Sequence, residues 1–222
     1  MKSIRISEGV YLLTGPPLNN EGQAFLIKAS ECNVIVDSGA YGEVAFQNML
    51  YYGVKPWEVE YLVNTHAHVD RTGGDWLFHK YGVSIAAGEV DAEAIQRGDE
   101  KYTASDYIGI KPKPVPVGWR ISSDLNICEI EVILTPGHTA GSLSVYFNGT
   151  LLAGDALGPL CKKWGSDERA WLESLRKLLQ YEAEVLCVNN ECFYGKEKVK
   201  QVLEKSIELG PPWLEDKECK IF

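Results

Sequence analysis

The chain lacks any run of apolar residues as long as the ~18–20 needed to cross a membrane as a helix. Residues 1–15, MKSIRISEGVYLLTG, contain no apolar stretch of the length found in secretory signal peptides. Basic residues are in the minority: 22 Lys and Arg stand against 31 Asp and Glu, for a formal net charge of -9. Nucleic acids and anionic membranes attract clustered positive charge, so neither is expected as a main partner. We therefore expect a soluble cytoplasmic protein whose partner is a small-molecule substrate.

The chain also lacks a C-x-x-C pair, although it contains six cysteines. Neither a zinc ribbon nor a thioredoxin-type redox motif is therefore indicated. In a cytosol most of these thiols are expected to be reduced, whereas an organism that tolerates internal disulfides would change that expectation. The scattered positions are Cys32, Cys128, Cys161, Cys187, Cys192 and Cys219.

What the chain does have is enough apolar material for a full core, 45% of its 222 residues. Short apolar or alternating segments bounded by Gly, Pro and Asn predict strands over 9–15, 23–29, 33–39, 59–65 and 83–87. Helical patterns lie over 42–53, 73–82 and 88–98. Strands that alternate with helices are typical of helix-covered sheets, so the fold class is predicted to be α/β.

The second half repeats this rhythm after a proline-rich, extended connection over 98–119. Residues 126–135 predict one or two strands, and 142–155 predict a hairpin that turns at Asn148 and Gly149. A helix is expected over 166–181 with Ser166 as its N-cap. A strand over 184–190 and a closing helix over 196–210 complete the prediction.

Histidine is scarce, and three of the four histidines lie in two short turns that follow strands. His66 and His68 stand in THAHVD, and His138 stands in TPGHTAGS. A single buried histidine is usually an ordinary core residue, but this grouping with Asp70 and Asp155 indicates a metal site. His66 and His68 are two residues apart, so an extended backbone directs both to one side. Three imidazoles with an open fourth position form the ligand set that catalytic zinc prefers.

The motifs THAHVDRTGG, TPGHTAGS and LLAGD, in that order, resemble the metallo-β-lactamase superfamily, and VIVDSGA resembles its first motif. The resemblance extends from about residue 9 to about residue 210. It implies a four-layer αβ/βα sandwich, and we expect one such domain over 1–222. It also implies that Asp37 steadies the metal-binding loop, that a first metal is bound by His66, His68 and His138, and that Asp70 contributes to a second metal with Asp155 bridging or belonging to it.

Two positions depart from the family pattern. Arg71 stands where most members have a histidine, and Asn190 or Glu191 stands where most have their last histidine. We therefore expect one tightly held metal, zinc in the first place and iron as the alternative, with a second ion weak or absent. Glu191 is a candidate substitute ligand for that second ion. Arg71 is expected to hold Asp70 ionised through a charge-assisted contact, with Asp155 as a second candidate partner.

The leading functional prediction is a metal-dependent hydrolase that acts on an ester, thioester, lactone or related bond. A bound metal activates water, and Asp70 would orient that water and pass a proton to the leaving group. One alternative is an oxidoreductase of the persulfide dioxygenase kind, with a single iron on His66, His138 and Asp155. Another is a non-catalytic metal-binding protein.

Residues Lys162, Lys163 and Trp164 follow the last metal-binding turn. They are candidates for a pocket that takes an anionic, partly apolar substrate. A charged surface loop is the equally weighted alternative.

Overall fold

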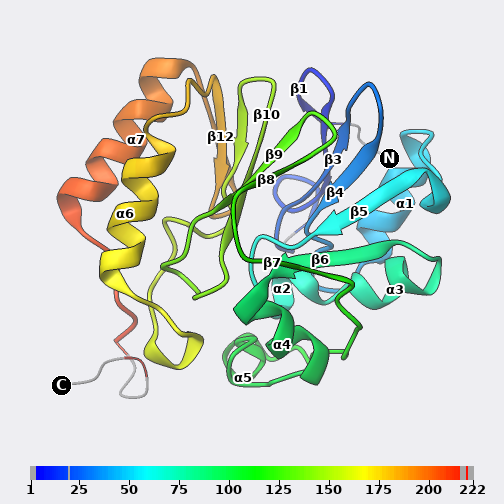
Figure 1. Ribbon diagram of the computed structural model, residues 1–222, viewed down its shortest axis with the longest axis horizontal. Helices are drawn as coiled ribbons and strands as arrows, with labels where there is room; N and C mark the ends of the chain where they lie inside the picture. The colour runs from blue at the N-terminus through cyan, green and yellow to red at the C-terminus, as the bar shows by residue number, and fades with distance from the viewer. Residues whose placement is uncertain (1–3, 20, 216–218, 220–222) are drawn as a thin grey trace.

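The computed structural model describes residues 4–19, 21–215 and 219. Two sheets face each other, and helices cover the outer face of each (Figure 1). The first sheet has the strand order β1-β2-β3-β4-β5-β6-β7. Neighbours from β1 to β4 pair antiparallel, and neighbours from β4 to β7 pair parallel. Its strands are β1 (Ile4–Ser7), β2 (Val10–Thr14), β3 (Ala24–Lys28), β4 (Asn33–Val36), β5 (Val59–Val63), β6 (Ser84–Gly88) and β7 (Trp119–Ile121).

The second sheet has the order β13-β12-β11-β10-β9-β8. Its strands are β8 (Leu125–Ile127), β9 (Ile130–Leu134), β10 (Leu143–Phe147), β11 (Thr150–Leu152), β12 (Val185–Val188) and β13 (Glu191–Tyr194). The hairpin of β10 and β11 turns at Asn148 and Gly149, both with positive φ, and Phe147 pairs with Thr150. Positive φ at both central residues is the geometry of a type I′ turn, so the hairpin prediction is confirmed.

The helices fall into two groups that cover the two sheets. The first group includes α1 (Glu43–Tyr51), α3 (Asp75–Lys80) and α4 (Glu89–Arg97) on the first sheet. Helices α6 (Glu168–Leu178) and α7 (Lys196–Leu209) cover the second sheet (Figure 1). Shorter segments are α2 (Val69–Thr72), α5 (Ser105–Ile108), η1 (Pro56–Glu58) and η2 (Lys162–Trp164). Within the described ranges, no helix is both long and apolar enough to cross a membrane.

Three apolar cores separate the layers. Strand β3 shows how one segment serves two of them: Phe25 and Ile27 belong to the core between the sheets, whereas Leu26 faces the helices. This division follows from the two-residue period of a strand. A third core packs the outer face of the second sheet against α6 and α7, through Trp171, Leu175, Leu186 and Leu203. The layers therefore run helix, sheet, sheet, helix, and the predicted α/β four-layer αβ/βα sandwich is confirmed.

Several local predictions were wrong. Helix α6 is capped by Asp167, whose Oδ1 accepts a hydrogen bond from the backbone N–H of Ala170 at 2.7 Å, and not by Ser166. Ser166 Oγ instead accepts from the backbone N–H of Cys161 at 2.9 Å. Strands β1 and β13 were not predicted, and β7 lies at the end of the segment that we expected to be a connection.

The sequence left the redox state of the cysteines open, and the structure pairs all six in disulfides. The pairs are Cys32–Cys128, Cys161–Cys219 and Cys187–Cys192. The first joins the turn between β3 and β4 to the turn between β8 and β9, so it links the two sheets. Its partners are 96 residues apart in sequence, and those of the second pair are 58 apart. Such pairings leave no local sequence signature.

Candidate metal centre

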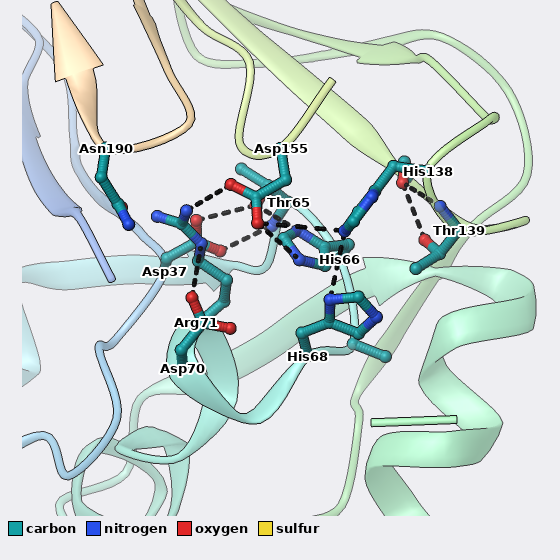
Figure 2. Close-up of polar contacts among 12 residues, drawn as sticks. Asp37, Thr65, His66, His68, Asp70, Arg71, His138, Thr139, Asp155 and Asn190 are labelled. Atoms are coloured by element: carbon teal, nitrogen blue, oxygen red, sulfur yellow. Dashed lines mark hydrogen bonds and ion pairs between the residues drawn. The ribbon is translucent and has the colours of Figure 1, made fainter. Parts of the chain in front are cut away.

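Four of the five residues predicted to bind metal converge at one edge of the two sheets, and Asp70 is the fifth. His66 and His68 follow β5, His138 follows β9, and Asp155 follows β11, so the site draws on both sheets (Figure 2). Each of these residues offers one ligand atom, and the four atoms all lie within 4.8 Å of one another. The three imidazoles are buried, and the Asp155 side chain is 18% exposed. The fold thus brings together four donors from segments far apart in sequence.

Asp37 holds the loop that carries the first two histidines, as the resemblance implies. Its Oδ1 accepts from the backbone N–H of Thr65 at 2.7 Å, and its Oδ2 accepts from the Thr65 hydroxyl at 2.8 Å. Gly154 comes so close to this loop that a Cβ on it would lie 2.4 Å from Thr65 Oγ1, and its φ is +50°. Only glycine therefore fits directly before Asp155 without displacing the histidine loop.

Hydrogen bonds fix the protons on two of the imidazoles. The Thr65 hydroxyl donates to Asp37, so it accepts from His66 Nδ1, which lies 3.2 Å away. His138 Nδ1 lies 2.9 Å from the carbonyl oxygen of Pro159, which can only accept. In both rings the proton therefore sits on Nδ1, and Nε2 presents its lone pair.

One nitrogen of each ring faces a common centre, and this donor set fits a metal ion. His66 Nε2 is buried and has no hydrogen-bond partner. His138 Nε2 lies 3.1 Å from His68 Nδ1, and Asp155 Oδ2 lies 3.7 Å from His66 Nε2 and 3.9 Å from His138 Nε2. Burial lowers the pKa of all three imidazoles below its ordinary value and Arg71 lowers it further, whereas Asp155 opposes the shift at His68 and His138. Neutral imidazoles beside a carboxylate are the donors that divalent metals such as zinc bind.

Arg71 lies beside this cluster, between two carboxylates (Figure 2). Its guanidinium is buried, donates through Nη2 to Asp155 Oδ1, and donates through Nη1 to the carbonyl oxygen of Gln23 at 3.2 Å. Its Nε lies 3.4 Å from Asp70 Oδ2. Burial alone would raise the pKa of Asp155, but Arg71 and the imidazoles bring it below the ordinary value. The arginine thus supplies the positive charge that keeps Asp155 ionised.

Asp70 lies on α2 and is not one of the four grouped donors. Burial raises its pKa to about 6, although the neighbouring Arg71 opposes the rise. Gly22 packs against it so closely that a Cβ there would lie 3.0 Å from Asp70 Oδ2. The structure therefore places Asp70 against Arg71 and beneath the loop between β2 and β3.

The two residues at the position of the missing histidine differ in where they lie. Asn190 is half-buried, and its Oδ1 accepts from the backbone N–H of Gln23 at 2.9 Å. Its side chain lies on the Arg71 side of the site (Figure 2). Glu191 is exposed at the start of β13. Asn190 is therefore connected to Arg71 through the backbone of Gln23, whereas the Glu191 side chain reaches solvent.

Residues 162–164 follow the loops of His138 and Asp155, and Trp164 packs against the histidines. Trp164 is buried, and its ring centroid lies 4.4 Å from that of His68 and 5.7 Å from that of His138. Lys163 pairs with Asp106 at 3.1 Å, and Lys162 Nζ lies 5.0 Å from the Trp213 ring. Trp164 is thus a wall of the site, and each lysine has a partner away from the histidines.

Sequence reasoning missed the groups that orient the ligands. The carbonyl oxygens of Pro159 and Gln23 act through the backbone, so their residue types carried no signal. Thr65 could have been found, because its hydroxyl is adjacent in sequence to His66 and follows a strand end.

Residues 20–188 match the family model of the metallo-beta-lactamase superfamily. The chain therefore belongs to the metallo-β-lactamase superfamily. This result confirms the resemblance that the three sequence motifs suggested.

Curated relatives share moderate identity with parts of the chain. A probable metallo-hydrolase of Methanocaldococcus jannaschii is 30% identical over 132 residues, which are 56% of this chain and 62% of that protein. A hydroxyacylglutathione hydrolase of Rhodospirillum rubrum is 30% identical over 138 residues, 59% of this chain and 47% of that protein. The chain thus spans less than two thirds of the length of each.

Solved structures agree over almost the whole chain. A metallo-β-lactamase of Cronobacter sakazakii with a HARLDQ motif superposes with a TM-score of 0.76 at 17% identity, covering 94% of this chain and 92% of the other. A subclass B3 metallo-β-lactamase of Bradyrhizobium japonicum gives 0.75 at 16% identity, covering 94% and 91%. At these identities the likeness establishes the fold alone.

Proposed function

We propose that the chain is a metal-dependent hydrolase that uses water to cleave an ester, thioester, lactone or related bond of a small molecule. The observation that carries this proposal is the convergence of three neutral imidazoles and Asp155, with ligand atoms within 4.8 Å of one another. The metallo-hydrolase and hydroxyacylglutathione hydrolase names of two relatives support it. The proposal includes a single domain over 1–222 and a cytoplasmic location, which requires a cytosol that tolerates the three disulfides.

In this proposal His66, His68 and His138 hold one metal ion, with Asp155 beside it. Zinc is the ion that best suits three nitrogen donors and a carboxylate. Such an ion, when bound, supplies Lewis acidity and lowers the pKa of water to about 7. Thr65 and Pro159 keep two ring nitrogens unprotonated and aimed at the centre.

Asp70 is proposed to move the proton. Its carboxyl has a pKa of about 6, which lies close to neutral pH and suits a group that accepts a proton and later returns it to the leaving group. Burial alone would raise the pKa of Asp70 further, and the positive charge of Arg71 opposes this rise. The pair therefore combines an ionisable carboxyl with a fixed cation.

Arg71 is also proposed to take the place of a second metal ion. Its guanidinium contacts Asp155, Asp70 and the Gln23 carbonyl, which are oxygen groups of the type that a second cation would bind. A second ion bound here is therefore expected to be weak or absent. Glu191 stays a predicted ligand for such a weak ion, and the pocket at Lys162, Lys163 and Trp164 stays a prediction.

The oxidoreductase alternative rests on a narrower donor set. His66, His138 and Asp155 form a two-histidine, one-carboxylate group, which is typical of mononuclear iron oxygenases. The hydrolase is favoured because His68 Nδ1 points into the same centre, 3.1 Å from His138 Nε2. A third imidazole fits zinc better than it fits that iron site.

A metal-resolved activity screen tests the proposal. Metal-free protein is reloaded separately with zinc, iron or manganese and assayed on generic esters, thioesters, lactones and phosphodiesters, with His138→Ala as the matched control. We expect zinc to restore hydrolysis of at least one carboxylic ester, thioester or lactone in the wild type and in no case in His138→Ala. Iron-dependent oxygen uptake with a persulfide would establish the oxidoreductase instead. Absence of turnover with every metal and substrate would favour the non-catalytic protein.

A further inference from the structure

A buried carboxylate outside the metal cluster joins the two histidine loops. Asp91 lies in the first turn of α4, directly after β6, and its side chain is completely buried. Its Oδ2 accepts from the backbone N–H of Ala67 at 2.8 Å and from the Thr139 hydroxyl at 2.7 Å. Its Oδ1 accepts from the backbone N–H of Gly141 at 2.8 Å and from the Tyr102 hydroxyl at 2.9 Å. All four partners are donors, so the carboxylate is fully used as an acceptor.

Two of these donors are adjacent in sequence to the histidines. Ala67 lies between His66 and His68, and Thr139 directly follows His138. A single oxygen atom of Asp91 therefore binds both segments that carry the imidazoles, one after β5 of the first sheet and one after β9 of the second. One side chain thus links the two histidine loops directly.

We propose that Asp91 is a positioning residue that sets the spacing of the three metal-binding imidazoles and thereby the affinity of the site for its metal. This inference rests on the metal centre of the proposed function. Hydrogen bonds behind metal ligands commonly contribute 10–100-fold to metal affinity, because they hold the ligands in the bound arrangement before the ion arrives.

Close packing around Asp91 leaves little room for the loops to adjust. A Cβ on Gly141 would lie 2.5 Å from Asp91 Oδ1, and a Cβ on Gly88 would lie 2.0 Å from the Gly141 carbonyl oxygen. The backbone of the His138 loop can therefore approach the carboxylate only because glycine stands at both positions. A shifted or rotated side chain at position 91 cannot restore all four hydrogen bonds in this space.

Asp91→Asn tests the proposal with almost no change of shape. The amide keeps one acceptor oxygen, and its NH₂ group would face one hydroxyl, which can accept, and one backbone N–H, which cannot, so the backbone hydrogen bond on that side is lost. Asp75→Asn is the matched control: Asp75 is equally buried, and it accepts from Ser38 Oγ at 2.7 Å and Asn64 Nδ2 at 2.6 Å, not from the backbone of a histidine loop. Both variants are compared with the wild type under conditions where circular dichroism shows them folded.

The readout is the zinc dissociation constant, measured by competition with a chromophoric chelator. We expect Asp91→Asn to raise it by about 10–100-fold and Asp75→Asn to leave it within about threefold of the wild type. The visible spectrum of the cobalt-loaded protein should change in Asp91→Asn alone. A residue that only stabilised the fold would lower the unfolding temperature without moving either quantity at a temperature where the variant is folded.

A second pair of variants keeps the test decisive if Asp91→Asn fails to fold. Thr139→Val removes one donor to Asp91, so it should weaken zinc binding. Thr139→Ser keeps the hydroxyl, so its zinc dissociation constant should stay near the wild-type value. Unchanged zinc affinity in both Asp91→Asn and Thr139→Val would overturn the inference, as would an equal loss in Asp75→Asn. If the wild type itself bound no zinc or other divalent ion, the metal centre of the proposed function would fail together with this inference.

Discussion

The substitution Arg71→Met removes the cation at the centre of the site and keeps a long apolar side chain in its place. Arg71 is 1% exposed, and its charge is shared by Asp155 and Asp70, whose side chains are 18% and 22% exposed. Removing one partner of a buried ion pair typically costs about 3–5 kcal/mol, because the remaining charge stays buried without compensation. Partial exposure of the two carboxylates lets water reach them, so we expect a loss at the lower end of this range, about 3 kcal/mol.

The assay is urea unfolding of the metal-free protein, followed by circular dichroism and analysed by linear extrapolation. Arg97→Met is the matched control, because Arg97 pairs with Glu93 on α4 but its side chain is 75% exposed. An exposed pair of this kind contributes about 0–1 kcal/mol. A loss below about 1 kcal/mol in Arg71→Met, or one equal to that of Arg97→Met, would refute the view that Arg71 neutralises buried carboxylates.

Two further predictions concern stability. Burial raises the pKa of Asp75 from 3.8 to about 7, so its contribution to stability is complete below pH 3.8 and is lost as the pH rises towards 7. The free energy of unfolding of the wild type minus that of Asp75→Asn should therefore fall between pH 4 and 7 in urea titrations, and a rise with pH would contradict the assignment. The Cys32–Cys128 disulfide spans 96 residues, whereas Cys187–Cys192 spans 5. Replacing the two cysteines of one pair by serine should lower the free energy of unfolding by about 4.5 kcal/mol for the first pair and by about 2 kcal/mol for the second. Equal losses in chemical unfolding would argue against loop closure as the source.

The donors of the candidate metal centre could be predicted because each lies in a short motif at the end of a strand. His66, His68, His138 and Asp155 were identified from sequence, and the structure brings their donor atoms together. Strand and turn chemistry is local, so the hairpin at Asn148 and Gly149 was also predictable. The motifs and their order indicated the family, and the fold of that family predicted how the two sheets are arranged.

What the sequence did not reveal depends on contacts between distant segments. Asp91 reads as an ordinary acidic residue near the start of a helix, and its importance appears only when Ala67 and Thr139 are seen to share its Oδ2. The disulfide partners Cys32 and Cys128 are brought together by the packing of the two sheets. Ser166 and Asp167 were both suitable caps for α6, and the choice between them depended on the hydrogen bond that Ser166 makes with Cys161.

Strand β13 was missed for a different reason. Asn189 and Asn190 both have positive φ, which reverses the chain within two residues and starts a new edge strand at Glu191. The strand predicted over 184–190 included both asparagines, although an Asn-Asn pair is itself a turn signal. The backbone conformation of this pair therefore forms the turn between β12 and β13.

We propose that one metal ion, with Arg71 in place of a second ion, forms the reactive centre of this protein. The most direct test is the metal content of the folded protein, purified without chelator and measured by mass spectrometry against protein concentration. One tightly bound ion per chain, zinc by preference, is the predicted result, with no second ion retained after dialysis. Two retained ions per chain would contradict the claim.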